Sequence, residues 1–367
     1  MRIVLTGGGS GGHLTPLVAV AKKIREKVPE VEFMFIGPDG KLEADIIGRE
    51  NIPIRNIMTG KLRRYFSLKN IIDFFRIPLG IAKSLWLLLF FMPDAIFSKG
   101  GAASFPVVVA GWLYRIPILT HESDSNPGLA NSMIGKFSNR VAVAYPETEK
   151  YFPAAQVVLT GNPLREDIAR GDADKAKKLF SLTESKKLIL VLGGSQGAAS
   201  INDKILNILP ELLHKYQIIH QVGEANFSEV ERRAGEAGIK IGREGYHVVA
   251  FLKEEILDVL AAADLVISRA GATSIAEIAA NKKPAIIIPL ETSASDHQRM
   301  NAYSLARIGG CVVMEDNNMG EHMLLEKIDQ IMNDELLRDK LAINIGTFYH
   351  PEAAGKIADG ILGMIKE

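Results

Sequence analysis

Residues 2–13 read RIVLTGGGSGGH, a short apolar run that passes directly into a loop of glycines. Gly7, Gly9 and Gly12 fit the pattern G-x-G-x-x-G, which at a strand-to-helix turn lets backbone N–H groups approach an anion. A second opening of this kind, KLILVLGGSQGAAS, occupies residues 187–200. The chain therefore starts each of its halves with a strand and a glycine loop.

Short runs rich in Val and Ile alternate with longer helical patterns along the rest of the chain. In the first half these runs lie at residues 31–37, 94–100, 116–121, 141–145 and 157–163, and in the second at 217–223, 247–251, 264–268 and 284–290. Continuous apolar strands separated by helices are typical of parallel sheets covered on both faces. The predicted fold class is α/β.

The two halves also correspond to each other in order. PDAIFSKGGAAS (93–104) matches ADLVISRAGATS (263–274), because each is a strand that runs into Ser, a basic residue and a glycine turn. All α/β units share some likeness, but ordered correspondences favour two similar Rossmann-like domains. The junction is expected within the polar residues 159–175.

Composition narrows the choice of function. The 367 residues carry 43 basic and 43 acidic side chains, so net charge gives no reason to expect nucleic acid as a partner. The single cysteine, Cys311, excludes an internal disulfide and a cysteine-cluster metal site, and fits a reducing compartment. The strand at the N-terminus leaves no room for a signal peptide. The most apolar stretch, residues 84–93, is too short to span a bilayer and is expected to be a buried helix.

The first glycine loop alone leaves two classes of protein open: a nicotinamide-dependent oxidoreductase, and a protein that uses the loop for another phosphate-bearing ligand. A nicotinamide-dependent oxidoreductase would place an acidic residue after the second strand, and Asp39 has that position. Against this class, His13 follows the loop directly, and a second loop lies at 193–197. Residues 268–277 add a third anion site, with Glu277 placed to accept hydrogen bonds from sugar hydroxyls. The alternative for Glu277 is a carboxylate in the first turn of a helix, where the dipole favours it.

Several motifs together resemble the MurG family of bacterial transferases, which add N-acetylglucosamine (GlcNAc) to lipid-linked N-acetylmuramoyl-pentapeptide. The motifs are GGSGGH (8–13), SKGGAASFP (98–106), HES-x-x-x-PGLAN (121–131), GNPLR (161–165), GGSQGA (193–198), SRAGATSIAEIA (268–279) and DHQ-x-x-NA (296–302).

The resemblance runs over essentially the whole chain and implies a GT-B glycosyltransferase, with two Rossmann-like parallel-sheet domains facing each other across a cleft. It assigns residues 1–162, completed by a C-terminal helix at 346–367, to an acceptor-binding and membrane-facing domain. Residues 163–345 become the domain that binds UDP-GlcNAc.

The implied reaction is attack of the 4-hydroxyl of N-acetylmuramic acid in lipid I on the anomeric carbon of UDP-GlcNAc. It inverts that carbon, releases UDP and makes lipid II for peptidoglycan. The reaction needs a base, stabilisation of the leaving diphosphate and close orientation of the two sugars. His13 is the expected base, since a histidine pKa near ~6.5 suits proton abstraction at neutral pH. The alternatives are that His13 only orients the loop, and that the pair His121-Glu122 supplies the base, so Glu122 is the second catalytic candidate.

The resemblance also assigns substrate contacts to individual positions. The first loop contributes Ser10, Gly11 and Gly12 near the sugar and the acceptor diphosphate, and Arg165 reaches the donor. His121, Asp124 and Asn126 are assigned to contacts with substrate. For the donor, Ser195 is assigned to the UDP phosphates, and the N–H groups of Ala272 and Thr273 to the diphosphate. The Leu252 backbone is assigned to uracil, Glu277 to the ribose and Gln298 to the GlcNAc hydroxyls.

Three departures from the family motifs bear on these assignments. Residues 121–124 read HESD where HEQN is common, so Asp124 lacks the donor of an amide and Asn126 is its possible substitute. Ser10 stands where Thr is common and keeps the hydroxyl, whereas Ala270 loses one. For Gln298 and Asn301 the alternative is a solvated helix start.

No metal site is expected, and no cofactor is required, with Mg²⁺ at most stimulatory. Residues 172–174, DAD, superficially match a metal-binding D-x-D, but helix capping explains them better. Helix N-termini can stabilise a leaving diphosphate in place of a cation.

A lipid acceptor requires contact with the bilayer. Between residues 61 and 83 six basic side chains accompany one acid, Asp73, with apolar and aromatic residues interleaved. Such a segment fits peripheral binding to an anionic membrane surface, at the cytoplasmic face of the bacterial inner membrane. Expected partners are UDP-GlcNAc, lipid I and the cell-wall and division machinery. The remaining alternatives are another GT-B transferase that uses a UDP-sugar on a lipid acceptor, a UDP-sugar-binding protein without catalysis, and the oxidoreductase.

Overall fold

The protein is described by a computed structural model that covers residues 1–9, 11–60, 68–194, 197–291, 293, 296–318 and 320–366, without the side chains of residues 68–75. The chain divides into two compact units. Unit 1 comprises Met1–Arg165 and His350–Glu367, and unit 2 comprises Glu166–Tyr349. The sequence placed these divisions after residue 162 and before residue 346.

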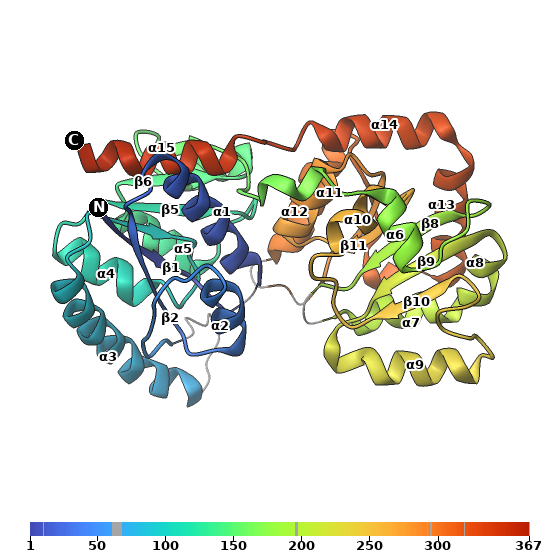
Figure 1. Cartoon of the computed structure of the whole chain (residues 1–367), viewed down its shortest axis with the longest axis horizontal. Helices are drawn as coiled ribbons and strands as arrows, with labels where there is room; N and C mark the ends of the chain where they lie inside the picture. The colour runs from blue at the N-terminus through green and yellow to red at the C-terminus, as the bar shows by residue number, and fades with distance from the viewer. Residues whose placement is uncertain are drawn as a thin grey trace. The chain divides into compact units, whose positions relative to one another are not determined.

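Unit 1 is built on a parallel sheet with the strand order β3-β2-β1-β4-β5-β6-β7 in the described residues (Figure 1). The strands are β1 (Arg2–Thr6), β2 (Glu32–Gly37), β3 (Ile54–Asn56), β4 (Ala95–Ser98), β5 (Ile118–Glu122), β6 (Arg140–Val143) and β7 (Val157–Leu159). From β3 to β6 this is the doubly wound Rossmann order, in which the direction of winding reverses between β1 and β4.

Helices cover both faces of this sheet. The helices of the unit are α1 (Gly11–Lys27), α2 (Lys41–Gly48), α3 (Leu68–Phe91), α4 (Phe105–Leu113), α5 (Leu129–Ile134) and α15 (Ala353–Lys366), with 3₁₀ turns η1 (Gly135–Phe137) and η2 (Pro146–Tyr151). Alternate residues of β1 explain the two layers. Ile3 and Leu5 pack with α1 and α15, whereas Val4 packs with α3 and α4.

The C-terminal helix returns to unit 1, where α15 packs along α1 (Figure 1). Its residues Ile357 and Ile361 are buried with the residues of β1 and β4. The expectation of one helix over 346–367 is wrong at its start, because α14 ends at Gly346 and the chain is not helical again until Ala353. The residues between the two helices connect unit 2 to unit 1.

Unit 2 repeats the arrangement with the order β10-β9-β8-β11-β12-β13 in its described part. Its strands are β8 (Lys187–Leu192), β9 (Tyr216–Gln221), β10 (Tyr246–Val249), β11 (Leu265–Arg269), β12 (Ala285–Ile288) and β13 (Val312–Val313). Its helices are α6 (Ala173–Leu179), α7 (Ala199–Asn207), α8 (Leu209–Lys215), α9 (Phe227–Glu236), α10 (Ile256–Ala262), α11 (Ala272–Ala280), α12 (His297–Arg307), α13 (Glu321–Asn333) and α14 (Glu335–Gly346), with 3₁₀ turns η3 (Glu166–Ala169), η4 (Glu224–Asn226) and η6 (Asp316–Asn318).

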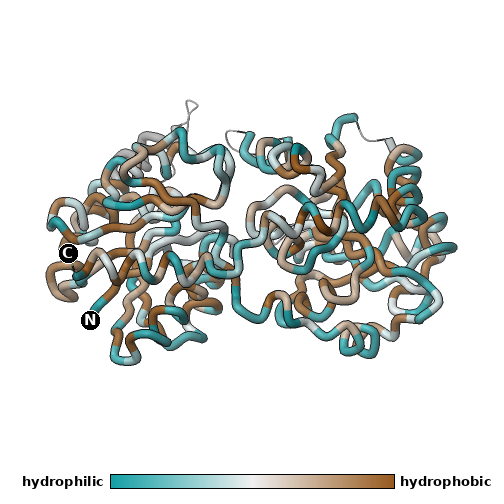
Figure 2. The backbone as a smooth tube through the Cα atoms, turned by 90° about the horizontal axis from the view of Figure 1, so that it is seen from above, coloured by the Kyte–Doolittle hydropathy of each residue, from teal (hydrophilic) through white to brown (hydrophobic). Residues whose placement is uncertain are grey.

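The strands of both units form the hydrophobic interior, which Figure 2 shows as brown stretches of the tube. Strand by strand the correspondence that the sequence indicates is present. β4 lies beside β1 in unit 1, and its counterpart β11 lies beside β8 in unit 2. In such sheets ligands bind outside the carboxyl ends of the strands, near the point where the winding reverses. The site is therefore sought at these two edges.

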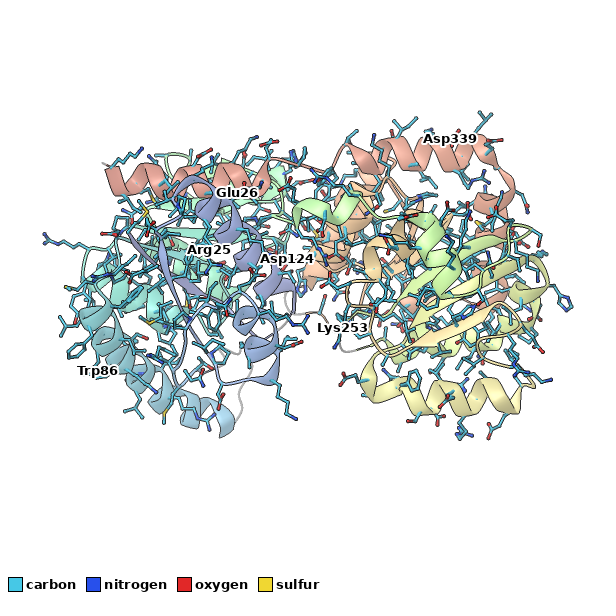
Figure 3. The ribbon with its side chains drawn as sticks, in the orientation of Figure 1. Arg25, Glu26, Trp86, Asp124, Lys253 and Asp339 are labelled. Carbon is cyan, nitrogen blue, oxygen red and sulfur yellow. The ribbon has the colours of Figure 1, made fainter. Side chains whose placement is uncertain are left out.

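The stretch at residues 84–93 is only partly buried, which corrects the expectation of a buried helix. It forms the C-terminal part of α3, where Leu87 and Leu88 face the core. Trp86, Leu89 and Phe90 are exposed by more than half, and Figure 3 shows Trp86 on the outer side of the helix. Among the described residues no helix is long and apolar enough to cross a membrane.

Candidate active site

Three loops meet at the carboxyl edge of the unit 1 sheet, because β1, β4 and β5 are neighbours. We call this set, residues 7–9, 11–13, 99–104 and 123–128, the first-unit edge. It brings together the glycine loop with His13, the turn at Gly100-Gly101 and the residues after Glu122. The sequence predicted that His13 and the pair His121-Glu122 share this edge, but not that the Gly100-Gly101 turn joins them.

His13 lies in the first turn of α1 and is half-buried. A Cβ placed on Gly101 would come 3.7 Å from Nε2 of His13, so the imidazole lies against this turn. Gly11 and Gly12 lie in the same helical turn and are also half-buried. Ser10 lies outside the described residues.

Glu122 ends β5 and is 2 % exposed. Its Oε1 accepts the Asp124 N–H at 2.9 Å, and its Oε2 accepts the Asn131 amide N–H at 2.8 Å. Burial, reinforced by the Asp124 carboxylate, raises the pKa of Glu122 to about 7. The carboxyl group thus titrates near neutral pH, but it is held inside the edge with both oxygens engaged.

Lys99, which the sequence reasoning left without a role, is fully buried directly after β4. Its Nζ donates to Ser123 Oγ at 3.0 Å. Burial lowers the pKa of Lys99, although Glu122 and Asp124 oppose that change by their charge. The signal for it was already visible as the basic residue in SKGGAAS, but a sequence does not show that a lysine is buried.

His121 joins β5 to the turn that follows β7. Its Nε2 lies 3.0 Å from the Gly161 carbonyl oxygen, and the ring is fully buried. Burial and then the charge of Lys99 lower the pKa of His121 well below its usual value, so the ring is neutral. A neutral, buried imidazole suits His121 to holding the edge together and not to taking a proton.

A second carboxylate at this edge escaped the sequence reasoning. Glu43, in the first turn of α2, is 4 % exposed and its Oε1 accepts the Gly9 N–H at 2.8 Å. Gly8 has φ +130°, and a Cβ there would come 2.9 Å from the same Glu43 oxygen. The glycine loop is therefore shaped around Glu43, which satisfies one of its N–H groups.

The loop after β5 carries the other first-unit candidates. Asp124 and Asn126 are half-buried, and the Asp124 carbonyl oxygen accepts a hydrogen bond from Thr148 Oγ1 at 2.9 Å. Figure 3 labels Asp124. Arg165, the last residue of unit 1 before the chain enters unit 2, is half-buried.

The corresponding edge of unit 2, the second-unit edge, comprises the loops after β8, β10, β11 and β12. In the loop after β8, Gly194 and Gly197 have φ +79° and +76°. A Cβ on Gly197 would come 2.3 Å from the Val222 carbonyl oxygen, so this position needs glycine. Ser195 lies outside the described residues.

Helix α11 begins at Ala272, next to β11, so the N–H groups of its first turn face the second-unit edge. Ala272 is buried and Thr273 half-buried. Glu277 is the sixth residue of the helix, so the alternative of a first-turn carboxylate is wrong. Arg269, which ends β11, donates from Nη1 to the Gly197 carbonyl oxygen at 3.3 Å and ties this strand to the glycine loop.

Two assigned contacts are already engaged within unit 2. The Leu252 N–H donates to Gln221 Oε1 at 2.9 Å, and the Leu290 N–H donates to Gln298 Oε1 at 3.0 Å. Gln298 is 7 % exposed and Asn301 is fully buried, with its amide donating to the Ala270 carbonyl oxygen at 3.2 Å. A solvated helix start is therefore wrong for both residues.

The DAD motif does what capping predicts. Asp172 Oδ1 accepts the N–H groups of Asp174 and Lys175 at 2.9 and 3.3 Å at the start of α6. Within the described part of the chain, no three His, Cys, Asp or Glu side chains are grouped as metal ligands.

Comparisons with known proteins find a family match in each half of the chain. Residues 3–143 match the glycosyltransferase family 28 N-terminal domain, and residues 188–350 match the family 28 C-terminal domain. A UDP-N-acetylglucosamine–N-acetylmuramyl-(pentapeptide) pyrophosphoryl-undecaprenol N-acetylglucosamine transferase of Clostridium perfringens is 40% identical over 331 residues, 90% of each chain. The chain belongs to the MurG family.

Other members of the MurG family also match over nearly the whole chain. A Bacillus anthracis transferase of this name, numbered 2, is 39% identical over 91% of this chain and 92% of its own. The crystal structure of Acinetobacter baumannii MurG superposes with a TM-score of 0.75 at 25% identity and covers 99% of both chains. The chain is thus a GT-B hexosyltransferase, an N-acetylglucosaminyltransferase, and the oxidoreductase alternative is wrong.

Proposed function

We propose that this protein transfers GlcNAc from UDP-GlcNAc to the 4-hydroxyl of N-acetylmuramic acid in lipid I and so makes lipid II for peptidoglycan. The observation that carries the proposal is the 40% identity with a transferase of that name over 90% of both chains. The two Rossmann-like units fit the reaction, since each offers a glycine loop and helix N-terminus at a carboxyl edge.

In the proposed reaction the second-unit edge binds the donor. The first-turn N–H groups of α11, at Ala272 and Thr273, donate hydrogen bonds to the diphosphate and stabilise the charge that develops as UDP leaves. The resemblance assigns Ser195 to the same phosphates and Arg165 to the donor. Because a helix N-terminus supplies positive potential here, no metal or other cofactor is required, and Mg²⁺ adds at most a modest stimulation.

Recognition of the donor's other parts uses side chains and backbone of unit 2. Glu277 accepts hydrogen bonds from the ribose hydroxyls, and the buried Gln298 contacts the GlcNAc hydroxyls. The Leu252 backbone reads the uracil edge. For its N–H to do so, the Gln221 side chain has to release it, since that hydrogen bond is made at 2.9 Å in the described structure.

The first-unit edge binds the acceptor, with the loop of Ser10, Gly11 and Gly12 near its sugar and diphosphate. His13 takes the hydroxyl proton, because it is half-buried at the edge and therefore within reach of a substrate. Glu122 is almost completely buried with both oxygens engaged, which suits it less as the base. His121, Asp124 and Asn126 orient the acceptor around it. The hydroxyl attacks the anomeric carbon with inversion, and no covalent enzyme intermediate forms.

The lipid acceptor is reached by peripheral attachment to the cytoplasmic face of the bacterial inner membrane. In support, α3 and α4 cover the same face of the unit 1 sheet and end in exposed apolar side chains. We call this set the apolar face: Trp86, Leu89, Phe90, Met92, Trp112 and Leu113. Exposed basic side chains lie nearby in sequence: Arg76 and Lys83 on α3, and Arg115 just after α4. Their positive charge suits anionic headgroups. The basic residues at 61–64 lie outside the described residues, and Asp73 and Lys69 lie in α3 without described side chains.

The test is transfer of labelled GlcNAc from UDP-GlcNAc to a lipid I analogue, with UDP-glucose as a parallel donor. Transfer from UDP-GlcNAc alone is the expected result and fixes reaction, donor and acceptor together. Equal transfer from UDP-glucose would indicate another GT-B transferase with a broader donor site. Binding of UDP without any transfer would contradict the acceptor assignment, and the HESD residues 121–124 would then be the first candidates for its cause. Recruitment by cell-wall and division proteins would be tested separately, by co-purification from crosslinked cells.

A further inference from the structure

A buried group of charges lies behind the surface of the first-unit edge. Lys99, Glu122 and Ser123 are 0, 2 and 8 % exposed, and Asp124 is half-buried beside them. The Lys99 ammonium donates to Ser123 Oγ at 3.0 Å, and Glu122 Oε1 accepts the Asp124 N–H at 2.9 Å. Burying ions is costly unless they are paired, so a fully buried lysine whose hydrogen-bond partner, Ser123, stands between Glu122 and Asp124 in the chain calls for a reason.

Asn131 connects this group to the turn against which His13 lies. Its Nδ2 donates to Glu122 Oε2 at 2.8 Å, and its Oδ1 accepts the Gly101 N–H at 2.7 Å. The amide enters the turn so closely that a Cβ on Gly100 would come 2.1 Å from Oδ1. The Gly100-Gly101 turn is therefore held by the orientation of one amide, and that orientation is held by Glu122.

The orientation depends on the charge of Glu122. An ionised carboxylate offers only acceptors, which match both of its N–H partners. When either oxygen takes a proton it becomes a donor and a poorer acceptor, so the hydrogen bond from Asn131 or from Asp124 weakens. The Asn131 amide is then free to turn over, which would present its NH₂ to the Gly101 N–H and cost that hydrogen bond as well.

We propose that Lys99 is a positioning residue, whose buried ammonium favours the ionised form of Glu122 beside Asp124 and so helps to fix, through Asn131, the Gly100-Gly101 turn that supports His13. The inference rests on the proposed function for its consequence on catalysis. It explains why a lysine occupies a fully buried position and why Asp124 is tolerated next to another carboxylate.

Charges from several elements act on Glu122 and have to be separated. Lys99 follows β4, Asp124 is on the loop after β5, and His121 is on β5 itself. His13 lies across the Gly101 turn on α1, and Glu147 is on η2, next to the Thr148 that bonds the Asp124 carbonyl oxygen. Burial and Asp124 raise the pKa of Glu122, and Lys99 lowers it. Removal of the Lys99 charge should therefore raise the pKa of Glu122, and removal of the Asp124 charge should lower it.

The test measures the protonation of Glu122 directly in the full-length protein. Glutamate carrying ¹³C in its carboxyl group is incorporated, the Glu122 resonance is assigned by its loss in Glu122→Gln, and its midpoint is followed from pH 4 to pH 9. We expect the midpoint to rise by about one pH unit or more in Lys99→Gln and to fall in Asp124→Asn. In the double variant it should return toward the wild-type value. Lys136→Gln, which removes an exposed lysine on η1, should leave it unchanged.

The pH profile of GlcNAc transfer is the second readout. Its acidic limb should move up in Lys99→Gln and down in Asp124→Asn, with the double variant again near wild type. An unchanged Glu122 midpoint in Lys99→Gln, or a shift in the same direction in both single variants, would overturn the proposal. If Lys99→Gln does not fold, Lys99→Met takes its place, since it also removes the charge but keeps an unbranched apolar chain in the buried position. A rise of the Glu122 midpoint in that variant supports the proposal, and an unchanged midpoint overturns it. If the midpoints move in the variants as expected but the wild-type protein shows no transfer activity, the proposed function is overturned and the charge coupling is supported.

Discussion

His13 and Glu122 differ in burial, and this difference predicts the outcome of changing each. His13 is half-buried against Gly101, whereas Glu122 is enclosed with both oxygens bonded. We expect His13→Ala to lower kcat by about 10²- to 10⁴-fold, the usual contribution of a general base. The KM for UDP-GlcNAc should change little, because His13 is assigned to the acceptor and the donor contacts, apart from Arg165, are assigned to unit 2. Steady-state transfer assays measure both constants.

Glu122→Gln is the companion variant. It places an NH₂ group opposite one of the two N–H donors that Glu122 accepts, so the edge should loosen and kcat fall less than in His13→Ala. A folded His13→Ala enzyme with near-normal kcat, together with an inactive Glu122→Gln, would instead identify Glu122 as the base. The pH profile of the remaining activity would separate these assignments further.

The turn at Gly100 gives a prediction about stability. Gly100 has φ +82°, and a Cβ there would come 2.1 Å from Asn131 Oδ1. We expect Gly100→Ala to destabilise unit 1 by about 1–3 kcal/mol, because a strained backbone is combined with a steric conflict. Gly128→Ala is the control, since nothing lies within 4 Å of its Cβ and its φ is −64°. Urea unfolding compares them, and equal losses would contradict the role given to the turn.

At the level of single residues, the sequence predicted those positions that follow strands directly and missed those defined by burial. His13 and Glu122 adjoin apolar runs at the carboxyl edge, so their meeting could be expected. Lys99 and Asn131 were inside recognised motifs, but their roles depend on contacts among the turn after β4, the end of β5 and helix α5. Glu43 approaches Gly9 from a separate helix, α2, and no spacing rule indicates that contact.

Helix α3 carries the element-scale prediction. Its Trp86 and Phe90 rings lie 4.9 Å apart and are 59 and 66 % exposed. We expect Trp86→Glu with Phe90→Glu to reduce sedimentation with phosphatidylglycerol-containing vesicles strongly at low salt, because the apolar face loses buried area and gains charge. Leu336→Glu with Ile343→Glu is the matched control, since these exposed side chains lie on α14 in unit 2. Equal losses in both pairs would mean that the apolar face has no special part in binding.

Short edge strands and the two faces of a helix show where sequence patterns stop predicting structure. Strands with long apolar runs, such as β1 and β8, were found within a residue or two of their bounds. β3 and β13 were missed, because three or two residues at a sheet edge leave no recognisable run. The apolar stretch at 84–93 was read as buried because a helix and its partners are needed to decide which face meets the core. Here Leu87 and Leu88 meet it, whereas Phe90 does not.

The whole molecule consists of two units, and a buried histidine should make the stability of unit 2 depend on pH. In unit 2, His220 is fully buried between Tyr246 OH and Asn202 Oδ1, each at 3.0 Å, and burial lowers its pKa to about 3. An unfolded histidine has a pKa near ~6.5, so the neutral ring stabilises unit 2 above that pH. This contribution is lost as the pH falls from about 6.5 toward 3, by up to about 1.4 kcal/mol per pH unit.

His220→Gln should flatten this dependence, even though it lowers stability at pH 7 by removing a well-bonded ring. Urea unfolding followed by far-ultraviolet circular dichroism at pH 7 and pH 5 measures the difference. His214→Gln, at the end of α8, serves as the control histidine change in the same unit. If the wild type and His220→Gln lose equal stability between the two pH values, the buried ring is not the cause.

The assignment of the donor to one of the two similar units predicts how the molecule responds to a nucleotide. The ordered correspondence of PDAIFSKGGAAS with ADLVISRAGATS indicated a duplicated architecture, and both units show the same winding. Duplication alone does not tell which unit binds the donor. We propose that unit 2 binds the donor, which requires UDP to stabilise unit 2 and not unit 1. A ligand present at 100 times its Kd stabilises the state that binds it by about 2.7 kcal/mol.

Hydrogen exchange resolved by peptide can test this in the intact chain. With UDP, amides of β8, β11 and α11 in unit 2 should exchange more slowly in proportion to that stabilisation, and those of β1 and β5 in unit 1 should keep their rates. Glu277→Ala should weaken the effect by removing the ribose contact while leaving the glycine loop after β8 in place. Protection of β1 and β5 by UDP alone would contradict the assignment, because the nucleotide would then bind the unit that we assign to the lipid acceptor.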